Sequence, residues 1–252
     1  MDTIENYQAQ VDSDFEEEAR DELHAFEVHV GNMRVDGADK DGILEVFRAG
    51  LDRLMNLRNS VDKPLFDLLL RRMENYIGDL TDPTDDQLSD IDAFLDVMHG
   101  VLDGEIGGEI NEAEFFRSLP VRRPADLEDF RALDLEILVV DTNKTGARIV
   151  QRELVNCGYR VSLANRSFEA LELAIRTRPD MIISSGVLDE MSGVDLGSAL
   201  AVVQTTESIP FALLTSSNDA SLKRLPKSAA IIKKGGGFSD DFADALEKFG
   251  IA

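Results

Sequence analysis

Four short apolar runs in the second half of the chain each lead to a polar side chain. The runs cover residues 137–140, 181–183, 211–214 and 230–232, and the polar residues that soon follow are Asp141, Ser185, Thr215 and Lys234. Apolar runs of this length are typical of strands buried on both faces of a parallel sheet. In such sheets the functional groups lie at the carboxyl ends of the strands. We therefore expect the chemistry of this chain to involve a carboxylate, two hydroxyls and an ammonium at one edge of a sheet.

The segments between these runs predict the fold of this half. A further strand is expected at residues 159–163, and helices are expected at residues 146–156, 167–177, 196–203 and 240–249. Strands that alternate with helices predict a doubly wound, flavodoxin-like α/β domain around a five-stranded parallel sheet. We assign this domain to residues 134–252.

Several segments of this half resemble the receiver domain of two-component response regulators. They are residues 137–143, 179–185, 191–193, 209–215 and 232–234, and the resemblance covers essentially all of residues 135–250. It implies an acid pair after the first strand that holds Mg²⁺ and an aspartate after the third strand that accepts the phosphoryl group. It also implies a threonine or serine after the fourth strand and a lysine after the fifth. Phosphoryl transfer in such a site needs the carboxylate nucleophile and cations that neutralise the phosphoryl oxygens.

The chain departs from this pattern at the residues that carry the chemistry. Asp141 remains of the acid pair, but its neighbour is Thr142, and Ser185 stands in place of the acceptor aspartate. Thr215 and Lys234 remain. One aspartate is a weak ligand set for a hard cation, and a serine without an adjacent base is a poor nucleophile. We therefore expect a pseudoreceiver with no catalytic residue, no metal and no cofactor, in which Lys234 is free to pair with Asp141.

Three features near this pocket leave alternatives open. Asp189, four residues after Ser185, is a candidate relocated acceptor, although a solvated loop acid is the favoured interpretation. The glycines at residues 235–237 form either a phosphate-binding nest or, as we favour, a flexible loop. The stretch between Thr215 and Lys234 is shorter than the family pattern, and Leu225-Pro226 stands where a fourth helix is expected. We predict a reshaped or partly unwound helix there.

The first half of the chain has a helical period instead. Apolar residues recur at spacings of three and four over residues 11–33, 43–57, 65–77 and 85–102. Four amphipathic helices with short connections predict an antiparallel bundle, which we assign to residues 1–103. Residues 104–133 contain glycine-rich and proline-containing segments, so we expect a linker there, with a short helix near residues 112–119.

This bundle resembles the histidine phosphotransfer domain of chemotaxis-type kinases. The resemblance rests on residues 15–23, 45–50, 72–75 and 92–96 and covers roughly residues 12–103. It implies a phosphorylated surface histidine on the second helix. That position falls on Leu51, or on Asp52 when it is counted back from residues 73–75. Neither residue is a histidine, so we expect this domain to have lost its phosphorylation site as well.

Composition excludes several classes of function. The formal net charge is −23, which repels phosphate backbones and anionic lipid surfaces, so we expect no nucleic-acid partner and no membrane insertion. A single cysteine, Cys157, excludes a disulfide framework and a cysteine-rich zinc site. No apolar run approaches the ~20 residues that a membrane span needs, and the acidic N-terminus is unlike a signal peptide. We expect a soluble, cytoplasmic protein.

The leading functional hypothesis is a non-catalytic signalling adaptor in a two-component or chemotaxis-like phosphorelay. Its partners would be histidine kinases, phosphotransfer proteins or response regulators, bound without phosphorylation at the usual sites. The two halves are also candidates for docking on each other. We expect the chain not to be an enzyme.

Two alternatives belong to other classes. The first is an active phosphotransfer protein that uses a relocated histidine, the candidates being His24, His29 and His99. We expect none of the three to have neighbours that tune it for phosphotransfer, and we interpret them as surface or boundary residues too dispersed for a metal site. The second is a structural homodimer held by apolar linker residues, namely Phe115, Phe116 and Leu119.

Overall fold

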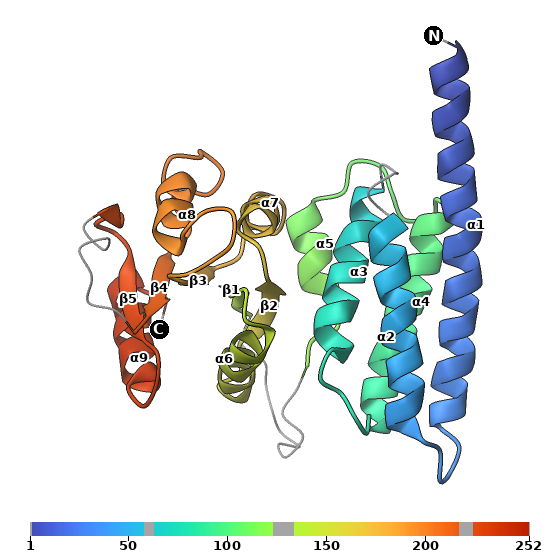
Figure 1. Ribbon diagram of the computed structural model, residues 1–252, viewed down its shortest axis with the longest axis horizontal. Coiled ribbons are helices and arrows are strands. Elements are labelled where there is room, and N and C mark those ends of the chain that lie inside the picture. The colour runs from blue at the N-terminus through green and yellow to red at the C-terminus, as the bar shows by residue number, and fades with distance from the viewer. Residues whose placement is uncertain (1, 58–62, 123–133, 217–223, 252) are drawn as a thin grey trace. The chain divides into compact units, whose positions relative to one another are not determined.

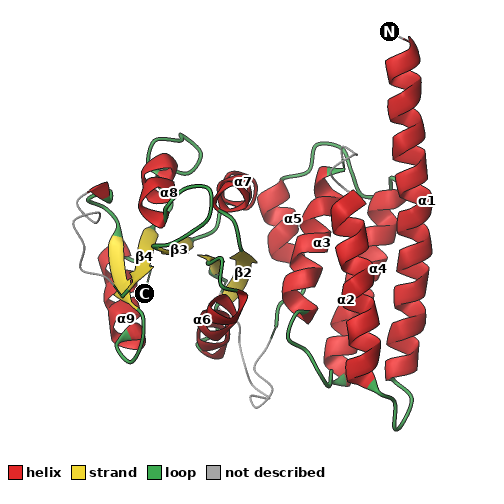
Figure 2. Cartoon of the chain, viewed as in Figure 1, coloured by secondary structure: helices red, strands yellow, loops and turns green. Residues whose placement is uncertain are grey.

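The computed structural model describes residues 2–57, 63–122, 134–216 and 224–251. Contacts divide the chain into two compact units, Met1–Arg122 and Arg123–Ala252. The first unit is helical, and the second combines helices with a parallel sheet (Figures 1 and 2).

Four helices pack side by side in the first unit. They are α1 (Asp2–Met33), α2 (Lys40–Leu57), α3 (Pro64–Ile77) and α4 (Asp85–Leu102). Helix α1 contacts α2 and α4, and α3 contacts the same two helices, so the four form a closed bundle (Figure 1). None of the described helices is both long and apolar enough to cross a bilayer.

Two of these helices begin where the sequence provides a start signal. Pro64 occupies the first turn of α3, where its missing N–H has no intrahelical partner to lose. Thr84 precedes α4 and forms a capping box with Gln87, in which each side chain binds the other residue's backbone N–H. Local side-chain chemistry therefore sets these two boundaries.

The bundle core includes a close contact between α1 and α2. Phe26 and Phe47 stack with their ring centroids 4.1 Å apart. Gly50 permits this approach, because a Cβ at that position would lie 2.5 Å from the Phe26 ring. Leu51, the next residue of α2, is 1% exposed and belongs to the same core. Phe47 and Leu51 therefore lie on the inner face of α2.

A short helix, α5 (Glu112–Ser118), lies in the segment that we predicted to be a linker. Phe116 of α5 is buried, and the Arg72 guanidinium of α3 lies over its ring, 4.7 Å from the centroid. Leu119 is buried as well. These contacts attach α5 to the bundle. Two of the three residues named for the alternative of a homodimer are thus buried and Phe115 is partly exposed, so the dimer stays a prediction. The rest of the predicted linker, residues 123–133, lies outside the described residues.

The second unit is built on a parallel sheet with the strand order β2-β1-β3-β4-β5. The strands are β1 (Glu136–Val140), β2 (Arg160–Ala164), β3 (Met181–Ser185), β4 (Phe211–Thr215) and β5 (Ala230–Lys233). The helices are α6 (Lys144–Asn156), α7 (Ser167–Thr177), α8 (Gly193–Leu200) and α9 (Phe238–Phe249). All strand pairs are parallel, so the predicted five-stranded parallel sheet is confirmed.

The helices cover both faces of this sheet (Figure 1). Helices α6 and α9 share one core cluster, with Val150 and Leu154 from α6 and Phe242 and Leu246 from α9. Helices α7 and α8 contact each other on the opposite face. Burial on both faces explains why β1 and β3 are buried along their whole length.

The prediction of a reshaped fourth helix falls partly on residues 217–223, which lie outside the described residues. Within the described residues 224–229, which include Leu225 and Pro226, there is no α-helix. The segment then enters β5 at the edge of the sheet, where Ile231 is partly exposed.

Candidate functional site

Polar side chains gather at the carboxyl ends of β1, β3, β4 and β5. Asp141 directly follows β1, Ser185 and Thr215 are the last residues of β3 and β4, and Lys234 directly follows β5. The parallel register aligns these ends, because Val140 pairs with Ser184 and the neighbouring strands continue in step. The sheet therefore brings the predicted residues to one edge, as the sequence indicated.

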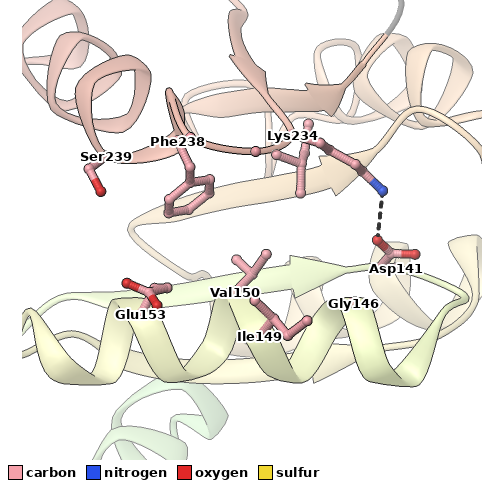
Figure 3. Close-up of a pocket in the computed structure, with 11 residues that line it drawn as sticks. Asp141, Gly146, Ile149, Val150, Glu153, Lys234, Phe238 and Ser239 are labelled. Carbon is pink, nitrogen blue, oxygen red and sulfur yellow. Dashed lines mark hydrogen bonds and ion pairs between the residues drawn. The ribbon is translucent and has the colours of Figure 1, made fainter.

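Lys234 is the centre of this cluster. Its Nζ donates to Asp141 Oδ2 at 3.1 Å and to Ser185 Oγ at 3.0 Å. Figure 3 shows the ammonium pointing at the Asp141 carboxylate. The Asp141 side chain is 5% exposed, whereas the Lys234 side chain is 42% exposed. A nearly buried carboxylate is thus paired with an ammonium that still reaches solvent, which avoids an uncompensated buried charge.

The turn between β1 and α6 holds the carboxylate in place. Asp141 Oδ1 accepts a hydrogen bond from the backbone N–H of Asn143 at 3.0 Å. Asn143 in turn caps α6, since its Oδ1 accepts from the N–H of Gly146 at 3.1 Å. Thr142 lies between them, at the position where the receiver resemblance implies a second acid.

Ser185 is in a poor environment for a nucleophile. Its side chain is buried, with only 3% of the residue exposed. The neighbour at hydrogen-bond distance is the Lys234 ammonium, which has three donors and no acceptor. The hydroxyl therefore faces a donor rather than a base that would take its proton.

Thr215 completes the edge from the side of β4. A Cβ built on Gly186, the residue after Ser185, would lie 3.6 Å from Thr215 Oγ1. The threonine hydroxyl is therefore close to the end of β3, as the sequence predicted.

The residues at this edge do not fit a Mg²⁺ ion. Mg²⁺ takes six oxygen ligands and is held in proteins by carboxylates. Thr142 and Ser185 stand where the receiver resemblance implies carboxylates, and the carboxylate of Asp141 faces the Lys234 ammonium at 3.1 Å. Across the described residues, no group of three or more His, Cys, Asp or Glu side chains is arranged to hold a metal.

The loop after β3 is attached to α7 by Glu190. The Glu190 carboxylate accepts from the backbone N–H of Phe168 at 3.1 Å and from Arg166 Nε at 2.8 Å. It also lies 3.1 Å from Ser167 Oγ, which donates to the Asp189 carbonyl at 2.9 Å. Arg166 precedes α7 without a side-chain cap of its own, so Glu190 supplies the anion that the helix N-terminus favours.

These contacts change the electrostatics of the loop and explain an unusual backbone. The N–H of Phe168, together with Arg166 and Ser167, holds the pKa of the Glu190 carboxyl below its usual value. Glu190 adopts φ 67°, which is uncommon for a residue other than glycine. Glu190 could not be identified from the sequence, because its partners lie more than 20 residues away along the chain.

The two alternatives near the pocket lie outside the cluster around Lys234. The Asp189 side chain is exposed, and within the described part of the chain it has no hydrogen bond to Lys234. Gly235 adopts φ +114°, and Gly237 precedes α9 without a side-chain cap. The role of these glycines as a phosphate nest stays a prediction.

In the helical unit, the position predicted for the phosphorylated histidine points inward. Leu51 lies in the bundle core, whereas Asp52 is exposed. A side chain at position 51 would therefore not reach a partner in this conformation, and the exposed neighbour is a carboxylate.

Glu27 of α1 lies between two of the three histidines. Its Oε1 is 3.0 Å from His99 Nε2, and its Oε2 is 3.3 Å from His24 Nδ1. His29 has no such partner among the described residues. We expected none of the histidines to have neighbours that tune it for phosphotransfer; the structure places the Glu27 carboxylate beside two of them, and the expectation stays a prediction. The His24–Glu27 spacing of one helical turn is readable in the sequence, but the approach of His99 depends on the packing of α4 against α1.

The chain is similar to response regulators over part of its length. No family model matches it. Response regulator MprA of Mycobacterium leprae is 31% identical over 87 residues, which are 34% of this chain and 37% of that protein. MprA of Mycobacterium ulcerans is 29% identical over 89 residues, 35% of this chain and 38% of the relative. The chain thus spans well under half the length of these curated relatives.

Solved structures of receiver domains are also similar to part of the chain. The signal receiver domain of a signal transduction histidine kinase from Syntrophus aciditrophicus is 28% identical, with a TM-score of 0.42, over 46% of this chain and 90% of that one. Chemotaxis response regulator CheY4 of Vibrio cholerae is 24% identical, with a TM-score of 0.41, over 46% of this chain and 98% of that one. In sequence, about a third of the chain is therefore homologous to response regulators.

We predict that Glu190→Gln removes a pH-dependent part of the stability of the α/β unit. The native state favours the charged carboxyl, so Glu190 stabilises the fold fully above the pKa of the unfolded chain, about 4.3. This contribution is lost as the pH falls through the lower pKa of the folded state. Urea unfolding at pH values from about 3 to about 7 should show wild type and variant converging in stability at acid pH.

Asp189→Asn is the matched control, because it removes a neighbouring acid whose carboxylate has no hydrogen bond within the described residues. This variant should leave the difference between the free energies of unfolding at neutral and at acid pH the same as in wild type. A Glu190→Gln curve that runs parallel to wild type at every pH would contradict the assigned role of Glu190.

Proposed function

We propose that the chain is a non-catalytic signalling adaptor of a two-component or chemotaxis-like phosphorelay. It docks on phosphorelay proteins without being phosphorylated at the usual positions. The observation that carries the proposal is the Lys234 ammonium, 3.1 Å from Asp141 and 3.0 Å from Ser185, in a pocket without an acceptor carboxylate. In this proposal the α/β unit is a pseudoreceiver that keeps the receiver-type sheet but not its chemistry.

The partners follow from what the chain keeps. The similarity to response regulators supports histidine kinases, phosphotransfer proteins or response regulators as binding partners. The helical unit, which we interpret as phosphotransfer-like, adds a second docking surface whose histidine position is the buried Leu51. An adaptor of this kind bridges or sequesters pathway components and has no enzymatic activity of its own.

We predict that binding to such a partner does not depend on phosphate. The full chain would be tested by biolayer interferometry against purified histidine kinases, phosphotransfer proteins and response regulators from its own genome. For at least one of them, the dissociation constant should stay within about twofold with or without acetyl phosphate, a difference of about 0.4 kcal/mol.

Ser185→Ala serves as the control for this experiment, because it removes the hydroxyl at the acceptor position and should leave the affinity unchanged. Binding that requires acetyl phosphate, or that is lost in Ser185→Ala, would contradict an adaptor that acts without phosphorylation. Failure of all three classes of partner to bind would contradict the docking role itself.

One observation favours a second candidate, an active phosphotransfer protein with a relocated histidine. The Glu27 carboxylate at 3.0 Å from His99 Nε2 orients that imidazole and leaves its other nitrogen as a nucleophile. His24 shares the same carboxylate but is more exposed, with 78% of its side chain accessible against 31% for His99.

The two candidates differ in a simple labelling experiment. The adaptor proposal predicts that wild type gains no acid-labile phosphate from a phosphorylated kinase. The second candidate predicts a label that His99→Gln abolishes, that Glu27→Gln reduces by roughly tenfold as for a lost orienting group, and that His29→Gln leaves intact. Appearance of that pattern would replace the adaptor proposal with the phosphotransfer one.

A further inference from the structure

A cavity of about 400 Å³ opens in the α/β unit between α6 and the start of α9. Figure 3 shows Ile149 and Val150 of α6 on one side of it and Phe238 of α9 on the other. Leu214 of β4 also lines it. Ligand sites in proteins have volumes of roughly 300–1,000 Å³ and mostly apolar walls. This cavity is therefore suited to a ligand with one ring-sized apolar group.

The two ends of this cavity are polar. The Lys234–Asp141 pair lies at one end, and Glu153 and Ser239 lie at the other (Figure 3). Glu153 and Gly146 both line the cavity from α6, and their separation along the helix is about 10 Å at ~1.5 Å per residue. A ligand that spans the cavity thus has room for an apolar body and a polar group at its end.

The loop before α9 leaves the cavity open. Gly235 and Gly236 are among its lining residues, and nothing lies within 4 Å of a Cβ built on either of them. At Gly235 the φ of +114° favours glycine in any case, whereas at Gly236 a side chain would have had space to extend. The two glycines therefore add no side chain to this part of the cavity wall.

The charged residues that line the cavity decide the sign of the charge that a ligand can carry there. Lys234 is already paired with Asp141 at 3.1 Å, so the two contribute no net charge. Within the described residues the Glu153 carboxylate has no ion-pair partner, and it is exposed to the cavity end. One negative charge thus remains, in a protein whose formal net charge is −23. A cation is attracted to this cavity and an anion is repelled.

We infer that the cavity binds a small monocationic amine with a ring-sized apolar body, whose ammonium pairs with Glu153. The apolar body lies between Ile149 and Phe238. This binding function is separate from the proposed docking function and does not depend on it.

Three probes of equal size but different charge test this inference on the full chain: 2-phenylethylamine, 2-phenylethanol and phenylacetate. Binding is followed by NMR through the backbone amide signals of Gly235, Gly236 and Ser239, three residues that line the cavity. We expect the amine to bind at least about tenfold more tightly than phenylacetate, because their charges have opposite signs. The affinity for 2-phenylethanol should lie between those for the amine and for phenylacetate.

Two variants separate the polar group of the ligand from its apolar body. Glu153→Gln should weaken the binding of the amine about threefold, as for a solvent-exposed ion pair. It should leave the affinity for 2-phenylethanol unchanged. Ile149→Ala truncates a side chain that is 56% exposed and should weaken amine and alcohol alike, by about threefold for the apolar contact removed.

Asp244→Asn is the matched control, since it removes one exposed acid of α9 that does not line the cavity. It should leave all three affinities unchanged. The inference is overturned if the amine moves no signal of the three amides, if phenylacetate binds as tightly as the amine, or if Glu153→Gln and Asp244→Asn have the same effect.

Discussion

At the carboxyl edge of the sheet, one ammonium balances one carboxylate. A receiver-type pocket with an acid pair and an acceptor presents three carboxylates to a single lysine, and the two uncompensated charges are what a divalent cation neutralises. In this chain the positions that the resemblance assigns to two of those acids are Thr142 and Ser185. Lys234 and Asp141 form a pair 3.1 Å apart that is neutral without a bound ion. The charges at this edge are therefore balanced by the residues of the chain itself.

The Lys234–Asp141 pair depends on the fold around it, because its residues follow different strands of the sheet. Lys234 follows β5, Asp141 follows β1 and Ser185 ends β3, so one side chain connects the ends of three strands. The surrounding loops are fixed by separate contacts, with Asn143 capping α6 and Glu190 binding the start of α7. These contacts hold the Lys234–Asp141 pair at one edge of the sheet, and this geometry is what supports the proposed docking role.

The sequence predicted the parts of the molecule that depend on local patterns. The wholly apolar runs gave the buried strands, and the parallel order of the sheet then brought Asp141, Ser185 and Lys234 together. Pro64 and Thr84 likewise marked the starts of two helices.

What could not be predicted depends on contacts between residues that are distant in sequence. Phe116 joins the bundle because Arg72 lies over its ring, and the glycines before it had suggested a linker. His99 meets Glu27 only because α4 packs against α1. In the sequence, nothing distinguishes Glu190 from an ordinary loop acid. Only the fold places it at the N-terminus of α7. Leu51, by contrast, lies on the apolar face of α2 that the helical period predicts, whereas Asp52, the position given by the second register, is exposed.

In the proposed function, the pocket around Lys234 does not accept a phosphoryl group. The most direct test is incubation of the full chain with Mg²⁺ and acetyl phosphate, read by intact mass, beside a Thr142→Asp/Ser185→Asp variant that restores the three carboxylates. We expect wild type to remain unlabelled while the variant shows whether the rest of the pocket still supports transfer. A phosphate on wild type that is lost in Asp141→Asn would contradict the account, because it would show that the pocket is still an active acceptor site.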